Sequence, residues 1–139
     1  MQYNLLNYNN YTSYCTTSNN NVDNKDGYLT TIIDYTLPDI FTVNEINETT
    51  VTLDRLLNNV MNASGRDYYA RANRTNYAGS SIINAMYYDT RKLALHSQDV
   101  VVTPLRDINL YHLYYLSNDL ATGGDTAWVT CIVMHLKAG

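Results

Sequence analysis

Residues that build helix surfaces are scarce in this sequence. Its 139 residues include only two glutamates, three lysines and two glutamines. Helical bundles and coiled coils carry such residues along their exposed faces, so this scarcity argues against both. Threonine, valine, isoleucine and tyrosine instead make up about a third of the chain, and these residues favour strands.

Long apolar runs are also missing. No stretch approaches the roughly 18 to 20 apolar residues that cross a bilayer, and the start, Met1-Gln2-Tyr3-Asn4, is neither basic nor apolar. We therefore expect a chain that does not enter a membrane and carries no secretion signal. The length is that of a single domain over residues 1–139.

Cysteine is too scarce for a disulfide framework or a zinc site. Cys15 and Cys131 lie near opposite ends of the chain, without the paired spacing that a metal site or a redox motif requires. We expect both to be free, small, buried residues. A disulfide that joins the first strand to the last is the alternative.

The net charge of -4 is unevenly distributed along the chain. Residues 1–61 hold seven anions and two cations, a balance of -5, whereas residues 62–92 hold five cations and two anions, a balance of +3. An acidic segment followed by a basic one favours self-association by charge complementarity, although mixed surface charge also serves solubility alone. Direct binding to nucleic acid requires a net basic domain, so we do not expect it.

The first third of the chain is predicted to be a short strand, an arm and a second strand. Residues 7–25 are dominated by Asn, Ser, Thr and Tyr, which favours an extended arm or loop. Fixing its backbone costs about 1 kcal/mol or more per residue, more than its few apolar side chains return, so we expect another subunit to order it. Alternation over residues 28–37 predicts a half-buried strand that ends at Pro38.

One helix is predicted, over residues 52–61. Five apolar residues there have the spacing of one helical face: Leu53, Leu56, Leu57, Val60 and Met61. Further strands are expected over residues 81–88, 91–95, 99–103, 108–116 and 127–137.

The last strand is largely apolar on both faces. Within residues 127–137, the alternating set that includes Trp128 is mostly apolar, and so is the set between those residues. We expect a central strand covered on both sides, so that Trp128→Ala leaves a cavity and costs about 3 kcal/mol or more. Together these elements predict a mainly β fold: an antiparallel β-sandwich or small barrel with one short helix and a long N-terminal arm or loop.

Side chains that commonly carry catalysis or bind metals occur without a recognisable pattern. His96, His112 and His135 lack helical spacing and any metal-binding signature, although the last two fall on adjacent predicted strands. The Gly123-Gly124 pair lacks the lysine of a phosphate loop and precedes a strand, which indicates a hairpin connection. We therefore expect no enzymatic activity, no cofactor and no metal site.

Tyrosine is the abundant aromatic residue, with 14 copies against one Phe and one Trp. It offers a large contact area with only two side-chain torsions and a polar tip, which suits contact surfaces, although strands favour it as well. Adjacent residues of a strand face opposite ways, so one tyrosine of a pair is left to contact a partner. The tyrosines that we expect at such an interface are Tyr8, Tyr11, Tyr14, Tyr68, Tyr69, Tyr87 and Tyr114.

The C-terminal pair of predicted strands carries a resemblance. Residues 109–119 lead through Gly123-Gly124 into residues 126–130, and this hairpin resembles those that close small β-structured virion proteins of tailed phages, of the decoration, minor capsid and head–tail connector kinds. The resemblance implies a non-enzymatic structural subunit of a virus particle, made in the host cytoplasm, that forms homo-oligomers and assembles with other virion proteins. A β-sandwich module that binds carbohydrate or another surface ligand through exposed Tyr and Asn is the alternative.

Overall fold

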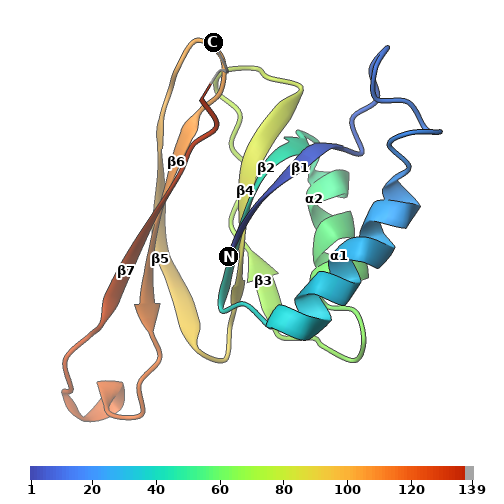
Figure 1. Cartoon of the computed structure of the whole chain (residues 1–139). Coiled ribbons are helices and arrows are strands. Elements are labelled where there is room, and N and C mark those ends of the chain that lie inside the picture. Colours follow the sequence, from blue (N-terminus) through green and yellow to red (C-terminus); the bar gives the residue numbers. More distant parts are fainter. Residues whose placement is uncertain (137–139) are drawn as a thin grey trace.

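The computed structural model describes residues 1–136, which form two β-sheets and two α-helices in three layers. The helices lie on one side of the first sheet, and the second sheet lies on its other side (Figure 1). The fold is mainly β, with two sheets that face each other and do not close into a barrel. Lys137, with which the predicted last strand ends, lies outside the described residues.

The first sheet, sheet A, has a mixed arrangement of strands in the order β1-β2-β4-β3. β1 runs parallel to β2 because a helix connects them in a crossover, and the other neighbours are antiparallel. The expectation of a purely antiparallel fold is therefore wrong at this edge. The strands of sheet A are β1 (Gln2–Tyr8), β2 (Ile40–Asn47), β3 (Tyr69–Arg71) and β4 (Ile82–Asp89).

The second sheet, sheet B, is antiparallel in the order β5-β6-β7, so the last strand lies at an edge. Trp128 on that strand is 56% exposed. The expectation of a central strand covered on both faces is wrong, and with it the cavity expected from Trp128→Ala, because no layer of the described residues covers the outer side of this sheet. The strands of sheet B are β5 (Leu93–Val101), β6 (Ile108–Tyr115) and β7 (Trp128–Val133), with the short helix η2 (Leu120–Thr122) between the last two.

Helix α1 (Val22–Thr36) occupies a segment that we expected to be arm and strand. The side chain of Asn21 accepts a hydrogen bond from the backbone N–H of Asn24 and caps the helix. The strand predicted over residues 28–37 is wrong, because its apolar residues also fit a helical spacing. The helix stops at Leu37, whose φ is 40°, directly before Pro38. The side chains that α1 buries are Val22, Asp26, Leu29 and Ile33.

The loop over residues 9–21 is held by hydrogen bonds within its own chain. The side-chain amide of Asn20 donates to the carbonyl of Asn7 at 2.8 Å, and the backbone N–H of Asn10 donates to the same carbonyl at 2.9 Å. The arm expected over residues 7–25 is therefore a shorter loop, since Tyr8 ends β1 and Val22 begins α1. These contacts remove the reason for assigning its order to another subunit.

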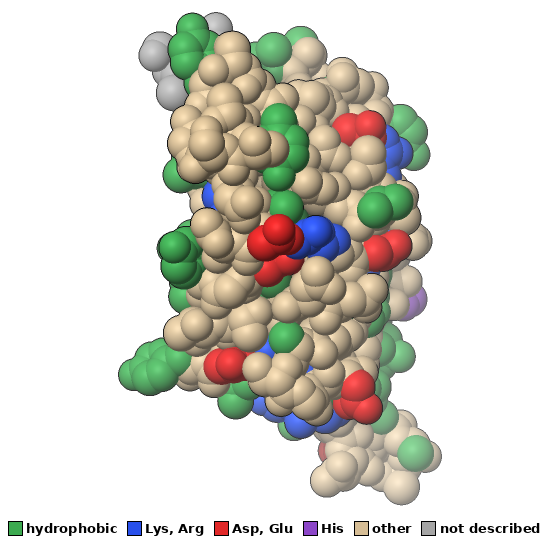
Figure 2. All heavy atoms as spheres, turned by 90° about the vertical axis from the view of Figure 1, so that its right-hand side faces the viewer, with side chains coloured by type: hydrophobic (Ala, Val, Ile, Leu, Met, Phe, Trp, Pro, Cys, Tyr) green, Lys and Arg blue, Asp and Glu red, His purple; other side chains and the backbone are tan. Residues whose placement is uncertain are grey.

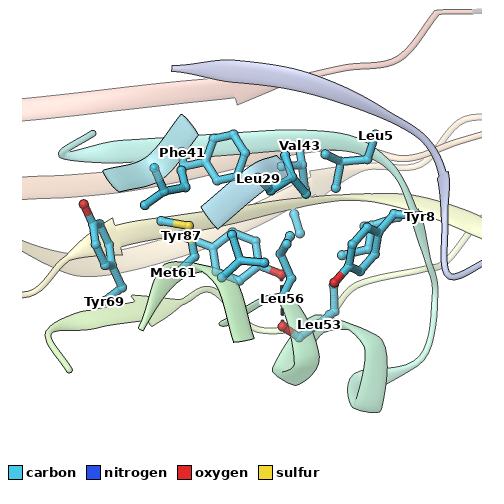
Figure 3. Close-up of a cluster of buried hydrophobic side chains, with 14 of the residues drawn as sticks. Leu5, Tyr8, Leu29, Phe41, Val43, Leu53, Leu56, Met61, Tyr69 and Tyr87 are labelled. Carbon is cyan, nitrogen blue, oxygen red and sulfur yellow. Dashed lines mark hydrogen bonds between the residues drawn. The ribbon is translucent and has the colours of Figure 1, made fainter. Parts of the chain in front are cut away.

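The helix predicted over residues 52–61 is confirmed as α2 (Thr50–Leu56) followed by a π-helical turn (Leu57–Met61). Thr49 caps it by accepting a hydrogen bond from the backbone N–H of Thr52. Both helices pack on sheet A, where Tyr87 donates its hydroxyl hydrogen to the carbonyl of Leu53 at 3.1 Å (Figure 3). Within residues 1–136, no helix has the length and apolar character needed to span a membrane.

The two sheets are joined by a second, smaller core and by buried asparagines. Met86 of sheet A packs with Tyr111 and Leu113 of sheet B. Beside this core, the buried side-chain amide of Asn84 donates to the carbonyl of Asp107 at 2.9 Å, and its oxygen accepts from Asn44 at 2.7 Å. The inner side of sheet B is thus used by sheet A, and the outer side is left for other contacts.

Candidate interaction surface

The outer face of sheet B, the side turned away from sheet A, carries apolar side chains from all three of its strands. Along β6 the buried residues Tyr111 and Leu113 face sheet A, so the residues between them face outward. The strand register then places Leu110 opposite Ile132, and Tyr114 opposite Trp128, on the outer side. This outer face consists of His96, Ser97, Asp99, Val101, Ile108, Leu110, His112, Tyr114, Trp128, Thr130 and Ile132.

An aromatic cluster forms one end of the outer face. The ring of Trp128 lies 5.0 Å from that of His96 and 5.5 Å from that of Tyr114, between ring centroids. The three rings come from three different strands, so the sheet itself holds them in place. A tryptophan fixed by its neighbours yet half exposed is the kind of side chain that dominates binding energy at protein interfaces.

A polar pair separates this cluster from the apolar residues farther along the sheet. The Nδ1 atom of His112 lies 3.0 Å from the hydroxyl oxygen of Thr130, so each has a partner within the sheet. Beyond them, Ile132 is 57% exposed beside Leu110. Along β6 and β7 the outer face therefore offers apolar contact area around a paired histidine and threonine, and Asp99 of β5 lies opposite Leu110.

The hairpin of β6 and β7 extends beyond the rest of the molecule. Figure 1 shows its loop as the part of the chain farthest from the helices. Val129 belongs to the inner side of the sheet but is exposed, as Trp128 on the outer side is. At the base of the loop the hairpin is thus accessible from both sides.

The helical side of the molecule has a different surface. Figure 2 shows its hydrophobic side chains as separate patches among polar atoms and groups of opposite charge. One such group joins Arg55 to Asp23 and Asp26, and another joins Arg66 to Asp34. This mixture is typical of a surface that faces solvent.

The tyrosines predicted at an interface lie in different places, and three of them are in the core. Tyr8, Tyr69 and Tyr87 are buried, so they are not available to a partner and their assignment to an interface is wrong. Strands and helices bury them because most of the ring is apolar. Tyr68 packs against the core, and the guanidinium of Arg91 lies 3.3 Å from its ring centre. The exposed loop over residues 9–21 holds Tyr11 and Tyr14, and the outer face of sheet B holds Tyr114.

The buried Asp26 of helix α1 is part of a hydrogen-bonded cluster. Asp26 accepts hydrogen bonds from the Tyr8 hydroxyl and from Arg55, whose Nε lies 2.9 Å from it. Burial and the neighbouring carboxylate raise the pKa of Tyr8 above its usual value. Among residues 1–136 no three His, Cys, Asp or Glu side chains are grouped so that they could hold a metal ion. These contacts join α1, α2 and β1 to one another.

A polar groove of about 450 Å³ runs between β5 and the loop over residues 72–79. The side-chain oxygen of Gln98 accepts from the backbone N–H of Asn73 at 2.8 Å, which ties the loop to the strand. Tyr77, on the same loop, is 72% exposed. The lining of the groove also includes Arg74 and Asp99. Hydrogen-bonding groups and an aromatic ring therefore border the same groove.

Of the outer face, sequence reasoning identified Tyr114 and missed the residues around it. The available signal was β7 itself, which has apolar residues of both parities and no charge. That pattern fits a central strand and an edge strand with a contact surface equally well, and the sequence does not say which neighbours a strand has.

Comparison with models of known protein families gave no match to the chain, and comparison with curated proteins gave none.

Proposed function

We propose that this protein is a non-enzymatic structural subunit of a virus particle and acts by protein–protein assembly. The observation that carries the proposal is the outer face of sheet B, on which apolar side chains, Trp128 and Ile132 among them, are more than half exposed. Apolar side chains that are exposed together on one face, unlike single scattered ones, mark an interaction site.

The exposure and composition of the outer face support a protein–protein interface. Three of its apolar side chains, Val101, Trp128 and Ile132, are each more than half exposed, and they lie on the same face of one sheet. Aromatic residues are enriched in such interfaces and acidic ones are depleted. The outer face has both properties along β6 and β7.

The virus particle as the setting is supported by the hairpin. Its strands β6 and β7 are those whose sequence resembles the closing hairpins of phage decoration, minor capsid and connector proteins. A projecting hairpin beside a sandwich-like pair of sheets suits a subunit that reaches a neighbour in a shell or ring. We infer copies of the same chain and other virion proteins as partners.

The test is the mass of the purified protein in solution, measured by light scattering. We expect an oligomer, and we expect Trp128→Ser and Ile132→Ser to reduce its mass. The matched controls are Tyr35→Ser and Val51→Ser, because these side chains are 92% and 77% exposed but lie on the helical side. An oligomer whose mass is unchanged in both sheet variants would contradict the proposal. So would an oligomer that dissociates to the same extent in the control variants.

A second candidate function is favoured by the polar groove beside β5. An exposed Tyr77 ring with Arg74 and Asp99 near it is the combination that binds a sugar ring by stacking and hydrogen bonds. This function predicts that binding to an array of glycans is lost in Tyr77→Ala and unchanged in Trp128→Ser. The opposite dependence, or no binding to any glycan, would reject it.

A further inference from the structure

The edge strands of the two sheets differ in how they are protected from pairing with another chain. Natural sheets block their edges with bulges, charges, prolines or very short strands. β1 has an irregular register and left-handed residues at Leu6 and Asn7. β3 has three residues and includes Arg71, and β5 has a register shift and carries Asp99.

Among the described residues, β7 is the edge strand without any of these devices. Its sequence over Trp128–Val133 contains no charge and no proline. Its register with β6 runs without a shift from Tyr114 and Trp128 to Asn109 and Val133. A straight, uncharged strand rich in β-branched residues is the kind of edge that pairs readily with another strand.

The hydrogen bonding of β6 and β7 shows which backbone groups of β7 point outward. The backbone N–H of Tyr115 donates to the carbonyl of Ala127 at 2.9 Å, just before β7 begins. Hydrogen-bonded pairs alternate along an antiparallel ladder, so Val129 and the residues two and four further along also bond to β6. The N–H and C=O groups of Trp128, Thr130 and Ile132 therefore point to the open edge.

We propose that β7 pairs antiparallel with β7 of a second copy of this chain, with Thr130 opposite Thr130 of that copy. A twofold axis perpendicular to the sheet maps each face onto itself, so paired residues must have the same parity. With Thr130 at the axis, Trp128 lies opposite Ile132 of the second copy. The edge-pointing backbone groups of Trp128, Thr130 and Ile132 in each strand then all have partners, in about six backbone hydrogen bonds.

The side chains agree with this register. On the outer face, Trp128 would lie beside Ile132 of the second copy, which is an aromatic and β-branched pair of the kind that stabilises sheets. No charged side chains of β7 meet across the axis, since β7 has none. The outer faces of the two copies then form one six-stranded surface. The identical β7 of a second copy supplies the parity, the side-chain pairs and the absence of charge, so no other kind of partner is needed.

This inference rests on the proposed function and identifies a second copy of this chain as a partner in assembly. Its test is a charge swap at the axis, because Thr130 is the residue that would meet its own copy. Thr130→Lys and Thr130→Glu each place like charges opposite one another, so we expect each variant to dimerise several-fold more weakly, up to about fivefold. An equimolar mixture of the two variants should recover the dimer, since opposite charges then meet.

The matched control is Ser97→Lys. Ser97 and Thr130 flank His112 in the same row of the outer face, one on each edge of sheet B. The same charge is thus added to the same face, away from the proposed axis, and the dimer should persist. Circular dichroism of each variant establishes that the fold is kept.

A second measurement uses cross-linking and does not depend on a tolerated charge. Cys131 is first changed to Ser, and Thr130→Cys is added, so that mild oxidation links two chains if the register is correct. The Cα atoms of opposed strand residues lie within disulfide range. Ser97→Cys in the same background should remain unlinked.

The outcomes separate this inference from the proposed function. A dimer restored by mixing, with cross-links at residue 130 and none at residue 97, supports pairing through β7. An oligomer that persists in Thr130→Lys but dissociates in Trp128→Ser would overturn pairing through β7 and leave the assembly function in place. A wild-type protein that is monomeric up to high concentration would overturn pairing with a second copy.

Discussion

Removal of the Asp26 carboxylate should destabilise the protein far more than removal of the neighbouring Asp23 carboxylate. Both side chains form an ion pair with Arg55. The side chain of Asp26 is 11% exposed, whereas that of Asp23 is 77% exposed. The same arginine therefore reports on a buried and an exposed partner.

The magnitudes follow from what each change leaves behind. Asp26→Ala leaves the buried Tyr8 hydroxyl without an acceptor and Arg55 with one carboxylate fewer, which costs about 3 kcal/mol. Asp23→Ala removes an exposed pair that water replaces, which costs about 0.5 kcal/mol. Tyr8→Phe in the wild type loses a hydrogen bond to a charged group, about 1.5 kcal/mol or more. In the Asp26→Ala background the same change is expected to be neutral or stabilising, because it removes an unpaired hydroxyl.

The assay is urea unfolding followed by circular dichroism, at one low protein concentration so that assembly does not add to the measured stability. The reasoning would be refuted by equal losses in Asp26→Ala and Asp23→Ala. It would also be refuted if Tyr8→Phe cost the same in both backgrounds, since the hydroxyl would then not depend on Asp26.

Three other predictions concern stability. The hydrogen bond from the Arg91 side chain, helped by its backbone N–H and opposed by burial, lowers the pKa of Asp89. A lowered pKa stabilises the fold above about pH 4 and that contribution is lost as the pH falls, so the urea midpoint should drop less between pH 6 and pH 3 in Asp89→Asn than in the wild type; an equal drop would reject this role. Trp128→Ala should cost under about 1 kcal/mol in the dissociated protein, whereas Leu113→Ala, fully buried between the sheets, should cost about 3 kcal/mol; similar thermal shifts for the two would contradict the exposed position of Trp128. Asn84→Ala should cost about 2 kcal/mol, because the Asn44 amide keeps only its longer hydrogen bond to the Met134 carbonyl and the carbonyl of Asp107 loses its donor; calorimetry that shows no loss of stability would contradict this role of Asn84.

Local signals predicted several elements well. The apolar spacing of residues 53–61 is incompatible with a strand, and that helix was predicted within two residues of its start. The segment of α1 was harder, because Leu29 and Ile33 satisfy a strand parity and a helical spacing alike. The capping residue Asn21 was the available signal for the helix, and the asparagine-rich composition around it indicated a loop instead.

The candidate surface could not be derived from the sequence because it depends on layering. Apolar residues on both faces of β7 predict burial unless one knows that the helices cover sheet A and leave the outer side of sheet B uncovered. The tyrosine signal had the same weakness, since Tyr87 and Tyr114 stand in similar strand sequences but only one faces outward. The packing of the layers on one another is a property of the tertiary structure, and it cannot be inferred from local composition.

The fluorescence of Trp128 tests most directly whether the outer face of sheet B is a contact surface, because the chain has one tryptophan. Its 56% exposure in the single chain predicts red-shifted emission and ready quenching by acrylamide in dilute protein. As the protein concentration is raised and assembly proceeds, we expect the emission to shift to the blue and the quenching to fall, with Tyr35→Ser behaving like the wild type. Emission and quenching that stay unchanged while the mass of the particle increases would show that assembly uses another surface.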